Sequence, residues 1–155
     1  MHPITKFVLT SGPCAGKTTA LSKIIEKFSD LGYLVFALPE TATLFNQAGV
    51  NFLTDNKEYF FDAEKALLSF QMQMEDQFEE MEQKSGKPAM LICDRGLMDV
   101  SAYLPKESWQ ALLDELTLSE VQARDKRYDT MITNEFTKRN QWYQLKKMQE
   151  QRLVY

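Results

Sequence analysis

The sequence predicts an α/β fold in three layers, with helices on both faces of a parallel sheet. Short continuous apolar runs alternate with stretches of helical periodicity, a pattern typical of parallel strands that are buried on both faces. The chain has 155 residues, enough for one domain, and 44% hydrophobic with 26% charged residues is the composition of a globular protein. No stretch approaches the roughly 20 apolar residues of a membrane span.

Four strands and at least four helices are expected. The strands are predicted at residues 7–9, 33–38, 89–93 and 128–133. The first helix, 18–31, has apolar residues at helical spacing and stops at Gly32. A loop is predicted from Pro39 to about Asn56, and helices at 108–116 and from a capping box, Ser119 with Gln122, to about 127.

A long helix is predicted over residues 58–84, closed by Gly86 and Pro88. Its apolar residues step by three or four positions along one face, which predicts that this face is core. The stripe consists of Phe60, Ala63, Leu67, Phe70, Met74, Phe78 and Met81.

The segment between the first strand and the first helix predicts a phosphate-binding P-loop. It reads SGPCAGKTT, from Ser11 through Gly12, Pro13, Cys14, Ala15, Gly16, Lys17 and Thr18 to Thr19. Small residues let backbone N–H groups converge on phosphate oxygens at a helix N-terminus. Lys17 is expected to contact the β- and γ-phosphates, and the Thr18 hydroxyl to ligate Mg²⁺. Ser11 stands where the usual pattern has Gly, and we expect some strain there without loss of binding.

Three further candidate residues follow the predicted strands, where ligands bind in parallel sheets. Asp94 is expected to hold Mg²⁺, Glu40 to orient or deprotonate a hydroxyl, and Arg95 to pair with a phosphate. Asp99 is either the N-cap of the stretch 100–104 or a second substrate contact. Taken with the P-loop, these positions predict an α/β P-loop NTPase with one site for a nucleoside triphosphate.

Charge and cysteine content narrow the classes of function. The net charge is −4, but residues 134–155 have five Lys or Arg against two Glu. We therefore divide the chain into a nucleoside-triphosphate-binding domain, 1–133, and a basic tail, 134–155. The acidic body argues against a nucleic-acid partner. Two cysteines, Cys14 and Cys93, make no disulfide framework and favour the cytoplasm.

Three segments resemble the TRPL translocation defect protein family: LTSGPCAGKTTAL, LPETAT and CDRGLMDVSAYLPKESWQALLDELTLSEVQARDKRYD. That family belongs to a P-loop class with kinase-like members, including ribosylnicotinamide kinase domains. The resemblance covers residues 6–129 and implies a GTP-binding protein that acts in membrane-protein trafficking. It also implies binding of phosphatidic acid and phosphoinositides, with a location at the membrane periphery. Glu40 matches the acid of the family's PE motif, and residues 94–96 match its DRG motif.

Residues 134–155 do not resemble the lid, further strand and lipid-interacting domain with which those relatives continue. A chain truncated after the fourth strand is therefore expected, and three functions stay open. The first is a GTP- and Mg²⁺-binding regulator. The second is a small-molecule, nucleoside-like kinase in which Glu40 is the general base and Lys17 and Arg95 hold the transferred charge. The third is an inactive fragment or an interaction module whose tail lies on anionic lipid.

Overall fold

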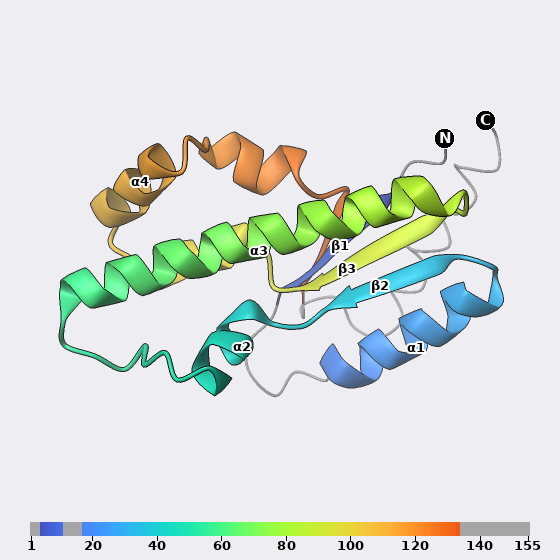
Figure 1. Ribbon diagram of the computed structural model, residues 1–155, viewed down its shortest axis with the longest axis horizontal. Coiled ribbons are helices and arrows are strands. Elements are labelled where there is room, and N and C mark those ends of the chain that lie inside the picture. The colour runs from blue at the N-terminus through green and yellow to red at the C-terminus, as the bar shows by residue number, and fades with distance from the viewer. Residues whose placement is uncertain (1–3, 11–16, 134–155) are drawn as a thin grey trace.

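The computed structural model describes residues 4–10 and 17–133, except for the side chains of Lys17, Thr18 and Ala20. Within that part of the chain, four parallel strands form one sheet in the order β2-β3-β1-β4 (Figure 1). The strands are β1 (Thr5–Thr10), β2 (Leu34–Leu38), β3 (Ala89–Asp94) and β4 (Thr130–Thr133). The first and third strands are therefore neighbours, and β1 lies inside the sheet.

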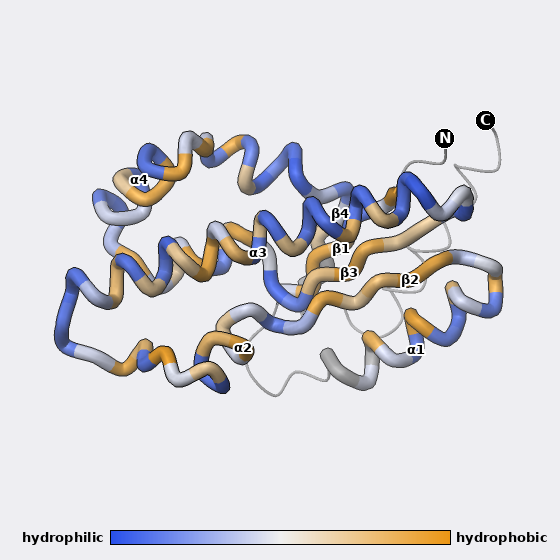
Figure 2. The backbone as a smooth tube through the Cα atoms, in the orientation of Figure 1, coloured by the Kyte–Doolittle hydropathy of each residue, from blue (hydrophilic) through white to orange (hydrophobic). Residues whose placement is uncertain are grey.

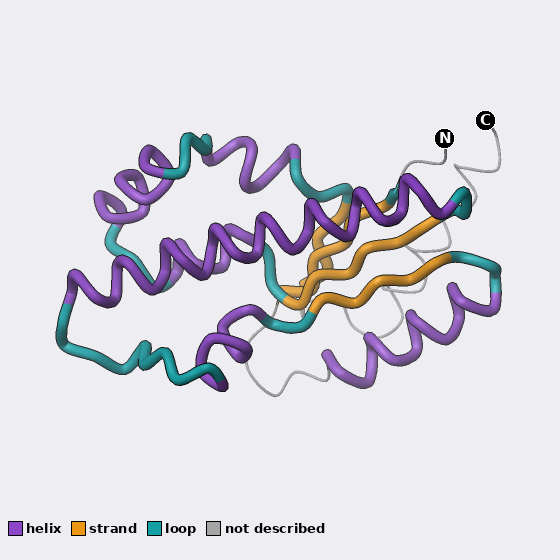
Figure 3. Tube along the Cα trace, viewed as in Figure 1, coloured by secondary structure: helices purple, strands orange, loops and turns teal. Residues whose placement is uncertain are grey.

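The strands are connected by helices (Figure 3). These are α1 (Lys17–Asp30), α2 (Thr41–Gln47), α3 (Lys57–Ser85), the 3₁₀ helix η1 (Leu97–Ala102), α4 (Lys106–Glu115) and the short helix η2 (Gln122–Lys126). None of the helices in the described ranges is long and apolar enough to cross a membrane.

Both faces of the sheet are buried, as the continuous apolar strands predict. On one face, Phe7 and Leu9 of β1 pack with Ile24 and Phe28 of α1. On the other face, Val8 packs in a cluster that α3 covers with its partly buried Met74 and Phe78. Figure 2 shows the strands as the most continuously hydrophobic segments of the backbone. The three-layer α/β fold predicted from the sequence is confirmed.

A second apolar cluster lies beyond the sheet, between the N-terminal half of α3 and the segments that follow β3. It contains the fully buried Leu68, Leu97, Leu112 and Leu113. Helix α3 begins at its N-cap Asn56, whose side chain accepts a hydrogen bond from the Tyr59 N–H at 3.1 Å. Helix α3 packs against two apolar clusters along its length: this cluster through Leu67 and Leu68, and the cluster on the sheet through Met74 and Phe78.

The expectation of a loop from Pro39 to Asn56 is wrong in its first half, where residues Thr41–Gln47 form α2. Seven residues are too few to show a clear helical period, and tertiary contacts decide the conformation. Thr41 is buried, and the Phe45 ring meets the Phe70 ring of α3 with centroids 5.7 Å apart.

The apolar stripe predicted as the core face of the long helix is also partly wrong. Phe70 and Met81 are 44% and 55% exposed. The buried residues of α3 include four polar ones, Glu64, Gln71, Glu75 and Glu82. A period-based prediction assigns polar residues to solvent, whereas here Glu64 and Gln71 line a cavity, and Gln71 and Glu75 join internal hydrogen bonds.

The capping box at the start of the last helical segment is confirmed. The Ser119 N–H donates to Gln122 at 2.8 Å, and the Gln122 N–H donates to the Ser119 hydroxyl at 3.2 Å. The helical conformation covers residues 120–126 with Arg127 as the C-cap, which agrees with the predicted end at about 127. Strand β4 begins at Thr130 instead of residue 128.

Candidate functional site

The predicted phosphate loop falls where the strand-helix context requires it. Strand β1 ends at Thr10 and α1 begins at Lys17. The predicted contacts Ser11, Gly12, Pro13, Cys14, Ala15 and Gly16 lie outside the described residues. The backbones of Lys17 and Thr18 lie in the first turn of α1, and Thr19 beside them is exposed. Their roles in binding phosphate and metal stay predictions.

Glu40 and Arg95, 55 residues apart, form an ion pair between Glu40 Oε1 and Arg95 Nε. Glu40 lies two residues after β2 and is the N-cap residue of α2, while Arg95 directly follows β3. Because β2 and β3 are parallel neighbours, their carboxyl ends meet at one edge. The other oxygen, Glu40 Oε2, accepts the Thr43 hydroxyl at 3.0 Å. Arg95 was predicted to pair with a phosphate, and its partner in this structure is Glu40.

The backbone of Arg95 is held in a left-handed conformation, with φ of 74°. An L-residue with a Cβ pays about 1 kcal/mol or more for this conformation. Two hydrogen bonds hold it: the Arg95 N–H donates to the Leu9 carbonyl at 2.9 Å, and the Gln71 amide donates to the Arg95 carbonyl at 3.0 Å. Strained residues of this kind cluster at functional sites. The left-handed conformation turns the backbone at Arg95, and the Arg95 side chain contacts Glu40.

The predicted metal position, Asp94, is the last residue of β3 and lies in register with Leu9 of β1. It is therefore one strand spacing from the end of the strand that leads into residues 11–16. Mg²⁺ in nucleotide sites takes one or two carboxylates together with phosphate oxygens and water. One carboxylate at this edge fits that donor set, so Asp94, with Thr18, would hold the ion.

Asp99 is not an N-cap, because η1 begins two residues earlier, at Leu97, and its N-cap is Gly96. The Asp99 carboxylate accepts the Gly96 N–H and the Thr10 hydroxyl, both at 2.6 Å. Asp99 therefore ties the DRG turn to the end of β1, immediately before the predicted phosphate loop.

Gly96 of the DRG turn is required by close packing. A Cβ added there would lie 3.0 Å from Cγ1 of the fully buried Val8. We expect Gly96→Ala to lower the free energy of unfolding by about 1–3 kcal/mol through overpacking, measured by urea denaturation. In a Val8→Ala background the same change should cost clearly less, because the clashing carbons are gone. Equal costs in both backgrounds would contradict the contact.

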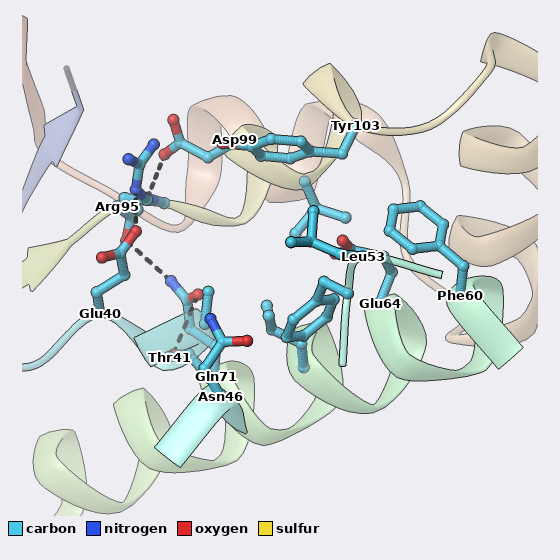
Figure 4. A pocket seen from close by; sticks show the side chains of 15 residues that line it. Glu40, Thr41, Asn46, Leu53, Phe60, Glu64, Gln71, Arg95, Asp99 and Tyr103 are labelled. Atoms are coloured by element: carbon cyan, nitrogen blue, oxygen red, sulfur yellow. Dashed lines mark hydrogen bonds and ion pairs between the residues drawn. The ribbon is translucent and has the colours of Figure 1, made fainter. Parts of the chain in front are cut away.

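A cavity of about 270 Å³ opens beside the Glu40–Arg95 pair (Figure 4). Its walls come from α2, α3, η1 and the connection between α2 and α3. Most of the surface that lines it is apolar, and the apolar side chains are Ala42, Phe52, Leu53, Phe60, Leu67 and Val100. The polar groups are Glu40, Arg95 and Asp99 at one end, Thr41, Gln71 and Asn46 near them, and Glu64 and Tyr103. An apolar hollow with a few placed polar groups is typical of a small-molecule site.

Glu64 is a carboxyl group in the wall of this cavity that is only 5% exposed. Desolvation by burial raises its pKa to about 7 from 4.5. Between these two pH values the folded protein binds more protons than the unfolded chain, so stability falls as the pH rises through this window.

Glu64→Gln should remove this fall in stability. We expect the variant to gain about 1–3 kcal/mol relative to the wild type between pH 5 and pH 8, measured by urea denaturation. Glu58→Gln, an exposed change on the same helix, is the matched control and should leave the pH dependence unaltered. Wild-type and Glu64→Gln stabilities that change in parallel would contradict the raised pKa.

A buried network of polar side chains connects α3 with the DRG turn and with Arg127 and Tyr128. Glu75 is fully buried, and its carboxylate accepts from Arg127 Nε at 2.6 Å, the Tyr128 hydroxyl at 2.8 Å and the Gln71 amide at 3.1 Å. Desolvation, with the charge of Glu75, raises the pKa of Tyr128, so this phenol stays protonated. Because Gln71 also donates to Arg95, the network fixes the DRG turn to α3.

Sequence reasoning missed Gln71, Glu75, Tyr128 and Glu64. The available signal is a polar residue within an apolar stripe of α3, which occurs at Glu64, Gln71 and Glu75. Cys93 is buried in β3 and burial raises the pKa of its thiol. The other cysteine, Cys14, lies outside the described residues.

The parallel sheet, the helix that starts after β1 and the acidic strand ends together define a P-loop nucleotide-binding domain of the α/β class. The chain belongs to the AAA domain family, whose match spans residues 6–152. A comparison with curated proteins found no match.

Solved structures to which this chain is similar include two kinases. APS kinase from Mycobacterium tuberculosis is 11% identical with a TM-score of 0.45, covering 97% of this chain and 99% of that one. Deoxyadenosine kinase from M. mycoides, with products bound, is 18% identical with a TM-score of 0.49, covering 92% of this chain and 70% of that one.

Proposed function

We propose that this domain transfers a phosphoryl group from a nucleoside triphosphate to a hydroxyl group of a small acceptor. The observation that supports it is the cavity whose wall contains Glu40 and Arg95. A domain that only binds and hydrolyses nucleotide needs no second, mostly apolar hollow at the carboxyl ends of its strands. A kinase needs such a hollow to bind its acceptor and to keep water away from the phosphoryl group that is transferred.

In the proposed reaction, Glu40 accepts the proton of the acceptor hydroxyl while the oxygen forms a bond to the γ-phosphorus. The bond from that phosphorus to the leaving nucleoside diphosphate breaks. Arg95 is paired with the Glu40 carboxylate, so its guanidinium lies beside the position where the transferred group would be and can stabilise negative charge there. The predicted loop, with Lys17 and Thr18, binds the triphosphate, and Asp94 holds the metal ion. Mg²⁺, when bound, neutralises charge on the β- and γ-phosphates.

Nucleotide binding is tested first by calorimetry with ATP and GTP, each with Mg²⁺. We expect binding by the wild type and its loss in Lys17→Ala, because no other predicted loop residue supplies a positive charge. Lys23→Ala, later in the same helix, should bind as the wild type does. Nucleotide binding that survives in Lys17→Ala would contradict the role of the loop.

Transfer is tested by measuring nucleoside diphosphate release with and without nucleosides as candidate acceptors. An acceptor that stimulates release by the wild type, and not by Lys17→Ala, is the expected result. Release that no hydroxyl-bearing acceptor stimulates would contradict the proposed kinase function.

A second candidate function is a GTP-dependent regulator of membrane-protein trafficking that binds anionic phospholipids. It is favoured by the resemblance of the loop, PE and DRG segments to the TRPL translocation defect protein family. In this case the Glu40–Arg95 pair has a structural role. GTP preference over ATP, without acceptor-stimulated turnover, would favour the regulator. Flotation with phosphatidic-acid vesicles, compared at low and high salt, would test the lipid contact.

A further inference from the structure

The cavity beside the catalytic pair has a second polar position, Glu64, that the proposed transfer reaction does not use. Glu64 lies on α3 seven residues before Gln71, which contacts the DRG turn. Seven residues of helix span about 10 Å. Figure 4 shows Glu40 and Arg95 at one end of the cavity and Glu64 towards the other, near Phe60. The two positions therefore face opposite ends of a bound small molecule.

The Glu64 carboxylate has no hydrogen-bond donor or cation as a partner among residues 4–10 and 17–133, and desolvation is the only cause of its pKa shift. The other charged groups that line the cavity are already engaged. Glu40 is paired with Arg95, and Asp99 accepts hydrogen bonds from Gly96 and Thr10. A carboxylate that burial has partly desolvated is stabilised when a hydrogen-bond donor or a cation approaches it. Such a group lining a small-molecule cavity is a ready binding position for a ligand.

The charge of the cavity specifies the chemistry of that ligand. Three carboxylates and one guanidinium line it, so its net charge is negative when all are ionised. A negatively charged group on the ligand would be repelled by Glu64 and Asp99, whereas a positively charged group would be attracted to them. A nitrogen cation also supplies the N–H donors that a carboxylate accepts in a strong, charge-assisted hydrogen bond.

We propose that Glu64 binds a cationic nitrogen of the acceptor. The acceptor is then a small molecule with an apolar or aromatic body, a hydroxyl group at the Glu40 end and a positively charged nitrogen at the Glu64 end. This inference rests on the proposed function for the identity of the ligand as an acceptor. The binding position itself depends only on the cavity and on Glu64.

Benzylammonium, benzyl alcohol and benzoate serve as probes of similar size, each a phenyl ring with one polar substituent that is positive, neutral or negative. Their binding to the wild-type protein is measured by NMR titration at pH 8 without nucleotide. We expect benzylammonium to bind about tenfold more tightly than benzyl alcohol, the value of one hydrogen bond to a charged group. Benzoate should bind more weakly than either probe.

The matched variants assign the preference to one side chain. Glu64→Gln keeps the shape of Glu64 and should abolish the preference for benzylammonium, while Glu58→Gln, exposed on the same helix, should retain it. Wild-type affinity for benzylammonium should fall between pH 8 and pH 6 as Glu64 gains a proton. The other titratable and charged groups facing the cavity are Glu40, Arg95, Asp99 and Tyr103, so the same titration in Glu64→Gln isolates the contribution of Glu64.

Equal affinity for benzylammonium and benzyl alcohol, no binding of benzylammonium, or a preference that survives in Glu64→Gln would each overturn the inference. These outcomes are separate from the proposed kinase function, because the titration uses neither nucleotide nor transfer. Phosphoryl transfer to an acceptor without a cation would leave the kinase function standing and remove the role of Glu64.

Discussion

Glu40→Gln is expected to lower the rate of phosphoryl transfer by about 10²–10⁴-fold, the contribution of a positioned general base. The amide keeps the size of the side chain and can still contact Arg95, but it cannot accept the proton of the acceptor hydroxyl. Affinity for the nucleotide should be unchanged, because Glu40 follows β2 and is not part of the predicted phosphate loop. Acceptor-stimulated diphosphate release and calorimetry with nucleotide measure the two quantities.

Glu107→Gln, an exposed change in the first turn of α4, is the matched control and should leave both quantities at the wild-type value. Parallel losses of binding and turnover in Glu40→Gln would show that Glu40 supports the fold of the site. In that case its role as a base would be contradicted.

Arg127→Ala is expected to lower the free energy of unfolding by about 3–5 kcal/mol, because it leaves the charge of Glu75 buried without its cationic partner. Arg127 also donates to the Met72 carbonyl at 2.7 Å and to Asp76 at 2.5 Å, and both bonds are lost with it. The measurement is urea denaturation at neutral pH.

Arg124→Ala is a control three residues away. Its ion pair with Asp125 is exposed, and pairs of this kind contribute little to stability because water and salt screen them. A similar, small loss in both variants would contradict a stabilising network around Glu75. Because the Gln71 amide joins this network to Arg95, we also expect Arg127→Ala to weaken the hydrogen bonding that holds the DRG turn.

The layers of the fold could be predicted because each strand is short, apolar and buried on both faces. That pattern is local, and residues 7–9 and 89–93 show it without reference to the rest of the chain. Helix α2 could not be predicted in the same way, because its position depends on contacts such as that between Phe45 and Phe70.

For the site, proximity of Glu40 and Arg95 follows from two parallel strands ending at one edge. The pairing itself, and the left-handed backbone of Arg95, depend on Leu9 and Gln71, which are distant in sequence. Glu64 and Glu75 look like solvent-facing helix residues by composition alone. Their burial is a property of what packs around α3, which no single segment encodes.

In the proposed reaction, the γ-phosphoryl group goes to an acceptor hydroxyl held beside Glu40. The most direct measurement is ³¹P NMR of the protein with Mg²⁺, nucleoside triphosphate and an acceptor that stimulates turnover. We expect the γ-phosphate resonance to be replaced by that of a phosphomonoester, in an amount equal to the diphosphate formed. Inorganic phosphate as the product in place of the phosphomonoester would contradict transfer and identify the domain as a nucleotide hydrolase.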